Sequence, residues 1–106
     1  MRLLDFTNVA PREVAPGYLG RYVHSDHITQ GRVDIAPGAV LPDHSHPHEQ
    51  WTLLLSGSFA LTVSGVTHVL RPGQMLYIAP HERHSARALT ASAVLDVFHP
   101  PRDDYR

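Results

Sequence analysis

Three histidines alternate with other residues in the segment His44-Ser45-His46-Pro47-His48-Glu49-Gln50. A further histidine, His84, follows a proline-containing turn far downstream. Neutral imidazole is the commonest protein ligand for metal ions, and few structural roles need several imidazoles together. The chemistry that these residue types favour is therefore the binding of a metal ion.

The spacing allows these side chains to share one target. In an extended strand, residues two apart point to the same face, so His44 and His46 can face one site while Ser45 points away. Gln50 and His48 have the same parity, although Pro47 interrupts the alternation. An isolated His-x-His pair is more often a plain polar face. Three imidazoles and one oxygen ligand on convergent strands would instead leave coordination positions open, as a catalytic metal site requires.

Composition sets the limits for the class of protein. The 106 residues suit one domain, residues 1–106, with a small core that a partner subunit would help to stabilise. The formal charge of −1, from 9 basic and 10 acidic side chains, argues against a nucleic-acid or membrane partner. Cysteine is absent, which removes thiolate chemistry, and the longest apolar run is Leu53-Leu54-Leu55, too short to span a membrane. We therefore expect a cytoplasmic protein.

Short alternating runs separated by Gly, Pro, Asp and Ser predict an all-β sandwich or barrel. The expected strands are Arg32–Ala36, Gln50–Leu55, Ser58–Val63, Thr67–Leu70, Met75–Ala79 and Ser92–Phe98. Ser56-Gly57 and Ser64-Gly65 are turn signals, each expected to close a hairpin. The segment from Met1 to Tyr22 is less patterned, and the polar tail from Pro100 to Arg106 is expected to leave the barrel.

A carboxylate interrupts the apolar strand Ser92–Phe98. Val94, Asp96 and Phe98 share one face of this strand. Burying a carboxylate is costly unless it is paired, and such groups in pockets are often functional. Asp96 is therefore either a catalytic group or the partner of an arginine in a structural salt bridge, and the strand pattern alone favours neither.

The metal-ligand segment and its surroundings resemble the two conserved motifs of the cupin superfamily. The first motif runs from Gly38 through His44, His46 and Gln50 to Gly57, and the second is the segment 73–84, which ends at His84. The resemblance implies a small double-stranded β-helix, or jelly-roll barrel, that holds a metal through His44, His46, Gln50 and His84. Gln50 stands where a carboxylate is usual, so the metal would keep its full charge and act as a stronger Lewis acid toward an anionic oxygen.

A closer resemblance is to the pectin-degradation cupins of the KdgF type, carried by residues 44–50 and 95–105. These proteins accelerate conversion of 4,5-unsaturated uronates to open-chain keto sugars. The resemblance implies that Asp96, Phe98 and Arg102 line the active site. Asp96 would move the proton as general base and acid, Arg102 would hold the substrate carboxylate, and Phe98 would pack against the sugar ring.

The sequence thus predicts a small cupin barrel, a homodimer, with one divalent transition metal (Ni, Zn, Mn or Fe) and a small carboxylate-bearing substrate. The expected reaction is metal-dependent isomerisation or ring opening of a small anionic sugar. Two alternatives stay open: an iron-dependent dioxygenase, and a binding module in which the metal only orients a metabolite. The parts played by His48 and His81, beside the ligands, are also open.

Overall fold

The computed structural model describes residues 1–106, and most of them lie in β-strands. The strands are β1 (Arg12–Ala15), β2 (Tyr18–His24), β3 (Thr29–Ile35), β4 (Val40–His44), β5 (Glu49–Ser56), β6 (Phe59–Val63), β7 (Val66–Leu70), β8 (Met75–Ile78), β9 (His84–Ala88) and β10 (Ser92–His99). Two short 3-10 helices, η1 (Phe6–Asn8) and η2 (Asp103–Tyr105), lie near the chain ends. The expected all-β class is confirmed.

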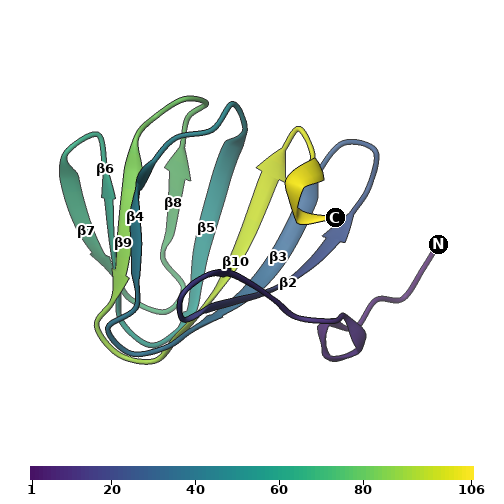
Figure 1. Cartoon of the computed structure of the whole chain (residues 1–106), viewed down its shortest axis with the longest axis horizontal. Coiled ribbons are helices and arrows are strands. Elements are labelled where there is room, and N and C mark those ends of the chain that lie inside the picture. The colour runs from purple at the N-terminus through teal and green to yellow at the C-terminus, as the bar shows by residue number, and fades with distance from the viewer.

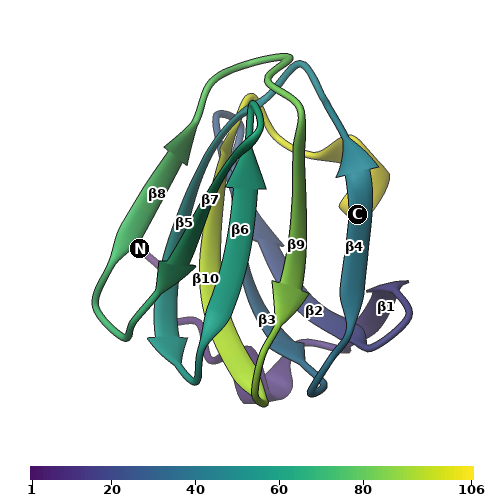
Figure 2. The same ribbon diagram turned by 90° about the vertical axis from the view of Figure 1, so that its left-hand side faces the viewer.

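The strands form two antiparallel sheets that face each other across the core (Figure 1; Figure 2). The larger sheet has the order β1-β2-β3-β10-β5-β8, and the smaller has the order β4-β9-β6-β7. From β3 onward the chain repeatedly crosses from one sheet to the other, which makes a jelly-roll barrel, as the resemblance noted above implies. Because β4, β5, β9 and β10 lie close in space, residues far apart in the sequence meet inside this barrel.

All six strands expected from alternation are present, with ends displaced by a few residues. The sequence pattern missed β1, β2, β4 and β9. In β2, the inward positions are Tyr18, Gly20 and Tyr22, and a Cβ at Gly20 or at Gly31 of β3 would collide with the Tyr22 ring. Because glycine alternates with tyrosine on the inward face, this strand does not show a regular spacing of apolar residues. In β4, Pro42 is tolerated because β4 is an edge strand.

One of the two hairpin predictions was wrong. Ser64 and Gly65 have φ of 48° and 80°, and they do close the hairpin between β6 and β7. Gly57 instead lies where the chain crosses from β5 in one sheet to β6 in the other. Its φ is 90°, and a Cβ there would collide with the backbone carbonyl of Ala91. Glycine is needed at this position for a close approach of two backbones.

The expectation that the C-terminal tail leaves the barrel was also wrong. The Tyr105 ring packs 4.5 Å from the Tyr22 ring and 6.1 Å from the Phe98 ring, measured between centroids. The backbone N–H of Arg102 donates to the Thr29 hydroxyl at 2.8 Å, in a buried position. Helix η2 therefore lies over the inner face of β2 and β10 (Figure 1). Aromatic packing outweighs the polar character of the tail.

The core lies between the sheets and combines apolar residues with a buried polar group. Leu54 and Ile78 are fully buried, and Phe59 and Leu61 pack between the sheets. The buried polar residues include the expected ligands and pocket residues described below. No helix in the structure has the length and apolar character that crossing a membrane would take.

Candidate metal centre and pocket

The sheet register brings three imidazoles from two distant segments together. His44 ends β4 and is the register partner of His84, which begins β9. His46 lies in the loop that follows β4, and its ring centroid is 4.9 Å from that of His84. One ring nitrogen from each of the three residues lies within 4.8 Å of the others. The structure therefore forms a compact three-histidine cluster that could hold a metal ion.

The protonation pattern of the three rings suits a metal. Each Nδ1 faces a backbone carbonyl oxygen two residues away: His44 faces that of Pro42 at 2.8 Å, His46 that of His48 at 3.0 Å, and His84 that of Glu82 at 2.9 Å. A carbonyl oxygen can only accept, so each Nδ1 carries the proton and each Nε2 keeps a lone pair. The Nε2 of His84 is buried and has no hydrogen-bond partner. A bound cation would satisfy this nitrogen by accepting its lone pair.

Burial keeps the inner imidazoles neutral. Desolvation lowers the pKa of His46 to about 4, with a smaller contribution from the positive charge of Arg102. The pKa of His84 is also lowered, chiefly by burial. Neutral imidazole is the form that binds metal, so these rings need lose no proton at neutral pH before they coordinate.

Gln50 extends the cluster from the opposite sheet. It lies in β5 with 8% of its surface exposed, and its Oε1 is 3.0 Å from the Nε2 of His46. Since the proton of His46 is on Nδ1, this contact places two lone-pair-bearing atoms face to face. A cation held between them would turn an unfavourable contact into shared coordination. The donor set of three imidazoles and one amide oxygen therefore fits a divalent transition metal.

A buried hydrogen-bond chain links Gln50 to Asp96. The Gln50 Nε2 donates to the Thr52 hydroxyl at 2.9 Å, and this hydroxyl donates to the Asp96 Oδ1 at 2.7 Å. The register places Thr52 beside Asp96 on neighbouring strands β5 and β10. Sequence reasoning missed Thr52, although its parity with Gln50 in one strand was a usable signal.

Asp96 is buried without an arginine partner, because its carboxylate is in none of the five salt bridges. Desolvation raises its pKa to about 6, and the hydrogen bond from Thr52 and the nearby amide of Gln50, which favour the charged carboxylate, oppose this only in part. The structural salt bridge left open above is therefore not formed. A carboxyl group with a pKa near neutrality, inside a pocket, suits a group that both takes and gives a proton.

Arg102 enters the same pocket, but its guanidinium is already engaged. Its Nε and one terminal nitrogen donate to the two carboxylate oxygens of Asp104 at 3.0 and 2.9 Å. The guanidinium carbon lies 4.9 Å from the centre of the Phe98 ring and 4.0 Å from that of Tyr105. The paired oxygens of Asp104 show that this fork is oriented to receive a carboxylate. Asp104 was not among the residues singled out from the sequence.

The remaining histidines of the two segments lie outside the cluster. His48 is half-buried, and its ring faces that of Phe98 at 6.5 Å between centroids, at the edge of the pocket. His81 is exposed, and its φ is 65°. Its contact with the ligand segment is through the backbone, where its N–H donates to the carbonyl of His46 at 2.8 Å. Trp51 points to the outer face of its sheet and packs on Tyr77.

The functional side chains share one cavity inside the barrel. Its volume is about 50 Å³, and residues from both sheets and from the C-terminal segment line it. His44, Gln50, His84, Asp96 and Arg102 are among the lining residues. The cavity therefore places the histidine cluster, the buried carboxylate and the arginine around the same space.

A jelly-roll barrel in which three imidazoles converge defines a class of protein, and the sequence comparison agrees. Residues 31–98 match the Cupin domain family, so the chain belongs to this family. It is 31% identical over 83 residues to the pectin degradation protein KdgF of Dickeya dadantii, which covers 76% of each chain. The structure of KdgF from a Halomonas species superimposes with a TM-score of 0.93 and 28% identity, over 100% of this chain and 99% of that one.

A second curated relative carries a different activity in its name. The dimethylsulfoniopropionate lyase DddW of Ruegeria pomeroyi is 30% identical over 86 residues. These residues are 81% of this chain and only 47% of the lyase. The likeness to KdgF extends over much more of the relative's length, so the resemblance found from the sequence motifs is confirmed.

Proposed function

We propose that this cupin binds one divalent transition metal through His44, His46, Gln50 and His84 and catalyses ring opening of a small anionic sugar, such as a 4,5-unsaturated uronate. The observation that carries the proposal is the position of Asp96. This carboxylate has a pKa raised to about 6 and lines the same cavity as the histidine cluster and Arg102. The likeness to KdgF supports the choice of substrate class.

The proposed reaction is an isomerisation that one carboxylate can serve. Asp96 takes the proton of the anomeric hydroxyl while the bond between the anomeric carbon and the ring oxygen breaks, which leaves an aldehyde and an enolate. Asp96 then returns the proton to the enolate carbon, which completes the ketone. Proton count and charge are unchanged over the cycle. When bound, the metal would supply Lewis-acid stabilisation of negative charge on substrate oxygens.

Arg102 is proposed to hold the substrate carboxylate in place of Asp104. The two side chains already form the paired geometry that a guanidinium makes with a carboxylate. A cavity of about 50 Å³ has room for a few water molecules, not for a sugar ring. Side chains that line the cavity must therefore shift when a sugar binds, and we propose that exchange of Asp104 for the substrate carboxylate frees Arg102 to do so.

The test is an assay of the metal-loaded protein with unsaturated galacturonate, in which loss of the conjugated absorbance reports ring opening and ketone formation. We expect a rate well above that of buffer, and an Asp96→Asn variant that keeps its metal but loses turnover. A metal-loaded wild-type protein that is no faster than buffer would reject this substrate. Oxygen consumption that depends on added iron and substrate would point to a dioxygenase instead.

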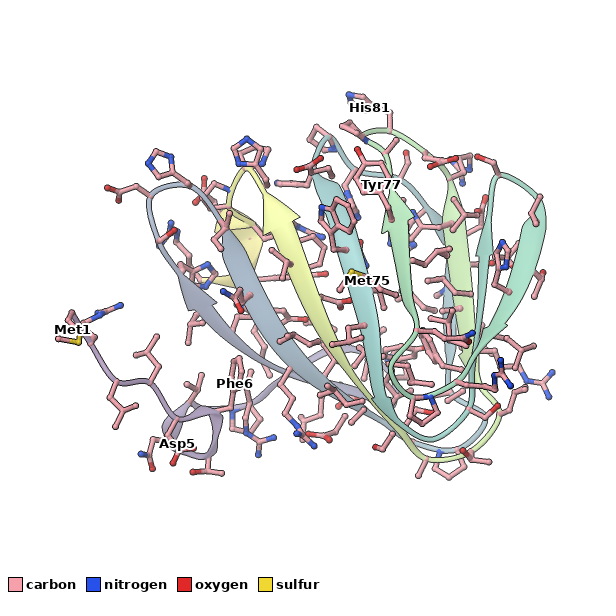
Figure 3. All side chains as sticks on the ribbon, turned by 180° about the vertical axis from the view of Figure 1, so that it is seen from behind. Met1, Asp5, Phe6, Met75, Tyr77 and His81 are labelled. Atoms are coloured by element: carbon pink, nitrogen blue, oxygen red, sulfur yellow. The ribbon has the colours of Figure 1, made fainter.

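We also propose that the protein is a homodimer through the outer face of the larger sheet. Trp51, Leu55, Met75 and Tyr77 lie on the outer face of β5 and β8 and are 40–52% exposed. Figure 3 shows Met75 and Tyr77 on this face. Exposed apolar side chains that adjoin one another favour contact with another protein surface, and a small barrel gains stability from burying them against a second copy.

Light scattering after size-exclusion chromatography tests this proposal. We expect the mass of two chains for the wild type and of one chain for Trp51→Glu. The matched control is Val69→Glu, which places the same charge on the smaller sheet at a residue 54% exposed. A wild-type protein of single-chain mass, or a control that dissociates equally, would contradict the interface.

A further inference from the structure

We infer that Thr52 is a positioning residue that turns the amide of Gln50 so that its oxygen, and not its nitrogen, faces the histidine cluster. The inference rests on the ligand set of the proposed function. An amide side chain has two ends of nearly equal size, so shape does not select which end faces a metal. Only the oxygen end can coordinate. The partners of the other end must therefore decide the orientation.

The hydrogen-bond chain has only one direction. Asp96 accepts at its Oδ1 from the Thr52 hydroxyl at 2.7 Å. A hydroxyl has one proton, so with that proton committed to Asp96 the oxygen of Thr52 can only accept toward Gln50. It accepts from the Gln50 Nε2 at 2.9 Å. The nitrogen end of the amide is thus held away from the cluster.

The other end of the chain imposes the same direction. The Nδ1 of His46 donates to the carbonyl of His48 at 3.0 Å, so its Nε2 offers a lone pair. If the Gln50 amide were reversed, its nitrogen would donate to this Nε2 and consume the electron pair that a metal needs. Thr52 prevents this reversal, because a reversed Gln50 would present an oxygen to a hydroxyl without a free proton.

The position of Thr52 leaves little alternative for its hydroxyl. Thr52 is 2% exposed in the middle of β5, between β10 and β8, where its register partners are Asp96 and Leu76. As a β-branched residue in a buried strand, it could be replaced by valine with the same shape and good strand propensity. The hydroxyl is therefore what distinguishes a positioning role from a packing role.

The experiment compares Zn²⁺ binding to metal-stripped wild type, Thr52→Val and Thr52→Ser by titration calorimetry at neutral pH, with far-UV circular dichroism as the check on folding. We expect Thr52→Val to weaken Zn²⁺ binding by about 10-fold, the lower end of the usual effect of a group that orients a ligand. Thr52→Ser keeps the hydroxyl and is expected to retain the affinity of the wild type.

A double variant tests whether Thr52 acts on the metal site through Gln50. In a Gln50→Ala protein there is no amide to orient, so adding Thr52→Val should change Zn²⁺ affinity no further. Equal affinity of Thr52→Val and wild type would overturn the inference. A loss that persists in the Gln50→Ala background, or that Thr52→Ser shares, would overturn it as well.

The outcomes separate this inference from the proposed reaction. If the expected binding pattern appears but the sugar is not converted, the substrate is wrong and the role of Thr52 stands. If the sugar is converted but Thr52→Val binds Zn²⁺ like wild type, the reaction stands and the role of Thr52 is refuted. A wild-type protein that binds no Zn²⁺ would refute the ligand set and both conclusions with it.

Discussion

Asp96→Asn is expected to make the protein more stable and inactive at the same time. Desolvation raises the pKa of Asp96 from 3.8 to about 6, so at neutral pH the folded protein carries a carboxylate that its surroundings disfavour. At about 1.4 kcal/mol per pH unit, this corresponds to about 3 kcal/mol of lost stability. Asparagine has nearly the same shape, carries no charge, and can accept the hydrogen bond from Thr52.

The stability difference between Asp96→Asn and wild type depends on pH, because it comes from the charge of Asp96. Below about pH 4, Asp96 is protonated in both the folded and the unfolded protein, so the charge costs nothing. Between about pH 4 and pH 6, the folded protein keeps a proton that the unfolded chain has lost, and the wild type loses stability relative to the variant as pH rises. Above about pH 6 the difference is constant and at its full size.

Urea unfolding of the metal-free proteins, followed by circular dichroism and by the fluorescence of the single tryptophan, measures this difference. We expect a gain of about 2–3 kcal/mol for the variant at pH 7 and almost none at pH 4, since the wild-type penalty is purely a charge effect. At about 4–8 °C per kcal/mol, the melting temperature should rise by at least about 8 °C at pH 7. A variant less stable than wild type at pH 7, or one with an equal gain at pH 4, would refute the reasoning.

Three further changes have defined outcomes. His84→Ala removes a buried ligand and should weaken Zn²⁺ binding by more than about 100-fold in calorimetry, beyond what loss of an orienting group costs; a smaller loss would argue against coordination by this ring. Asp104→Asn removes the charge that competes for Arg102, so the KM for a carboxylate-bearing sugar should fall with kcat little changed; a higher KM would instead show that Asp104 orients the arginine. Gly57→Ala forces a Cβ against a backbone carbonyl and should cost about 2 kcal/mol or more in urea unfolding, whereas Gly65→Ala, at a similar φ but in open space, should cost about 1 kcal/mol; equal costs would contradict the close approach.

Position in the sheet did not decide which strands were predictable, because the predicted strands include the edge strands β7 and β8 and the missed ones include the interior strands β2 and β9. The predicted strands are alternating runs bounded by turn residues. In β6, Phe59 and Leu61 face the core, and in β10 the apolar residues Val94 and Phe98 do so on either side of Asp96. Strands β2, β4 and β9 have glycine, proline or histidine at inward or edge positions, and β1 is a four-residue edge strand. Their pairing depends on neighbouring strands, which one segment of sequence does not reveal.

The grouping of His44, His46 and His84 was predictable from the resemblance of the two motifs to those of cupins, although strand parity does not explain it, because His46 lies in the loop after β4. The orientation of the Gln50 amide and the salt bridge between Arg102 and Asp104 were not predictable from the motifs. Both depend on contacts made after folding, between β5 and β10 in one case and within the returning tail in the other. Polar composition misled the interpretation of that tail, since Tyr105 covers an aromatic surface that only the folded sheet creates.

The ligands of the proposed metal centre differ in how their orientation is encoded. Each of the three imidazoles donates to a backbone carbonyl two residues away, so its orientation is set by its own stretch of chain. Gln50 depends instead on a chain of partners that ends at Asp96, 46 positions further along the sequence. Changes elsewhere in the barrel should therefore disturb the amide ligand before they disturb the imidazoles. Because the same chain ends at the proposed proton carrier, substitutions that reshape the pocket for another substrate would alter the metal's fourth ligand as well.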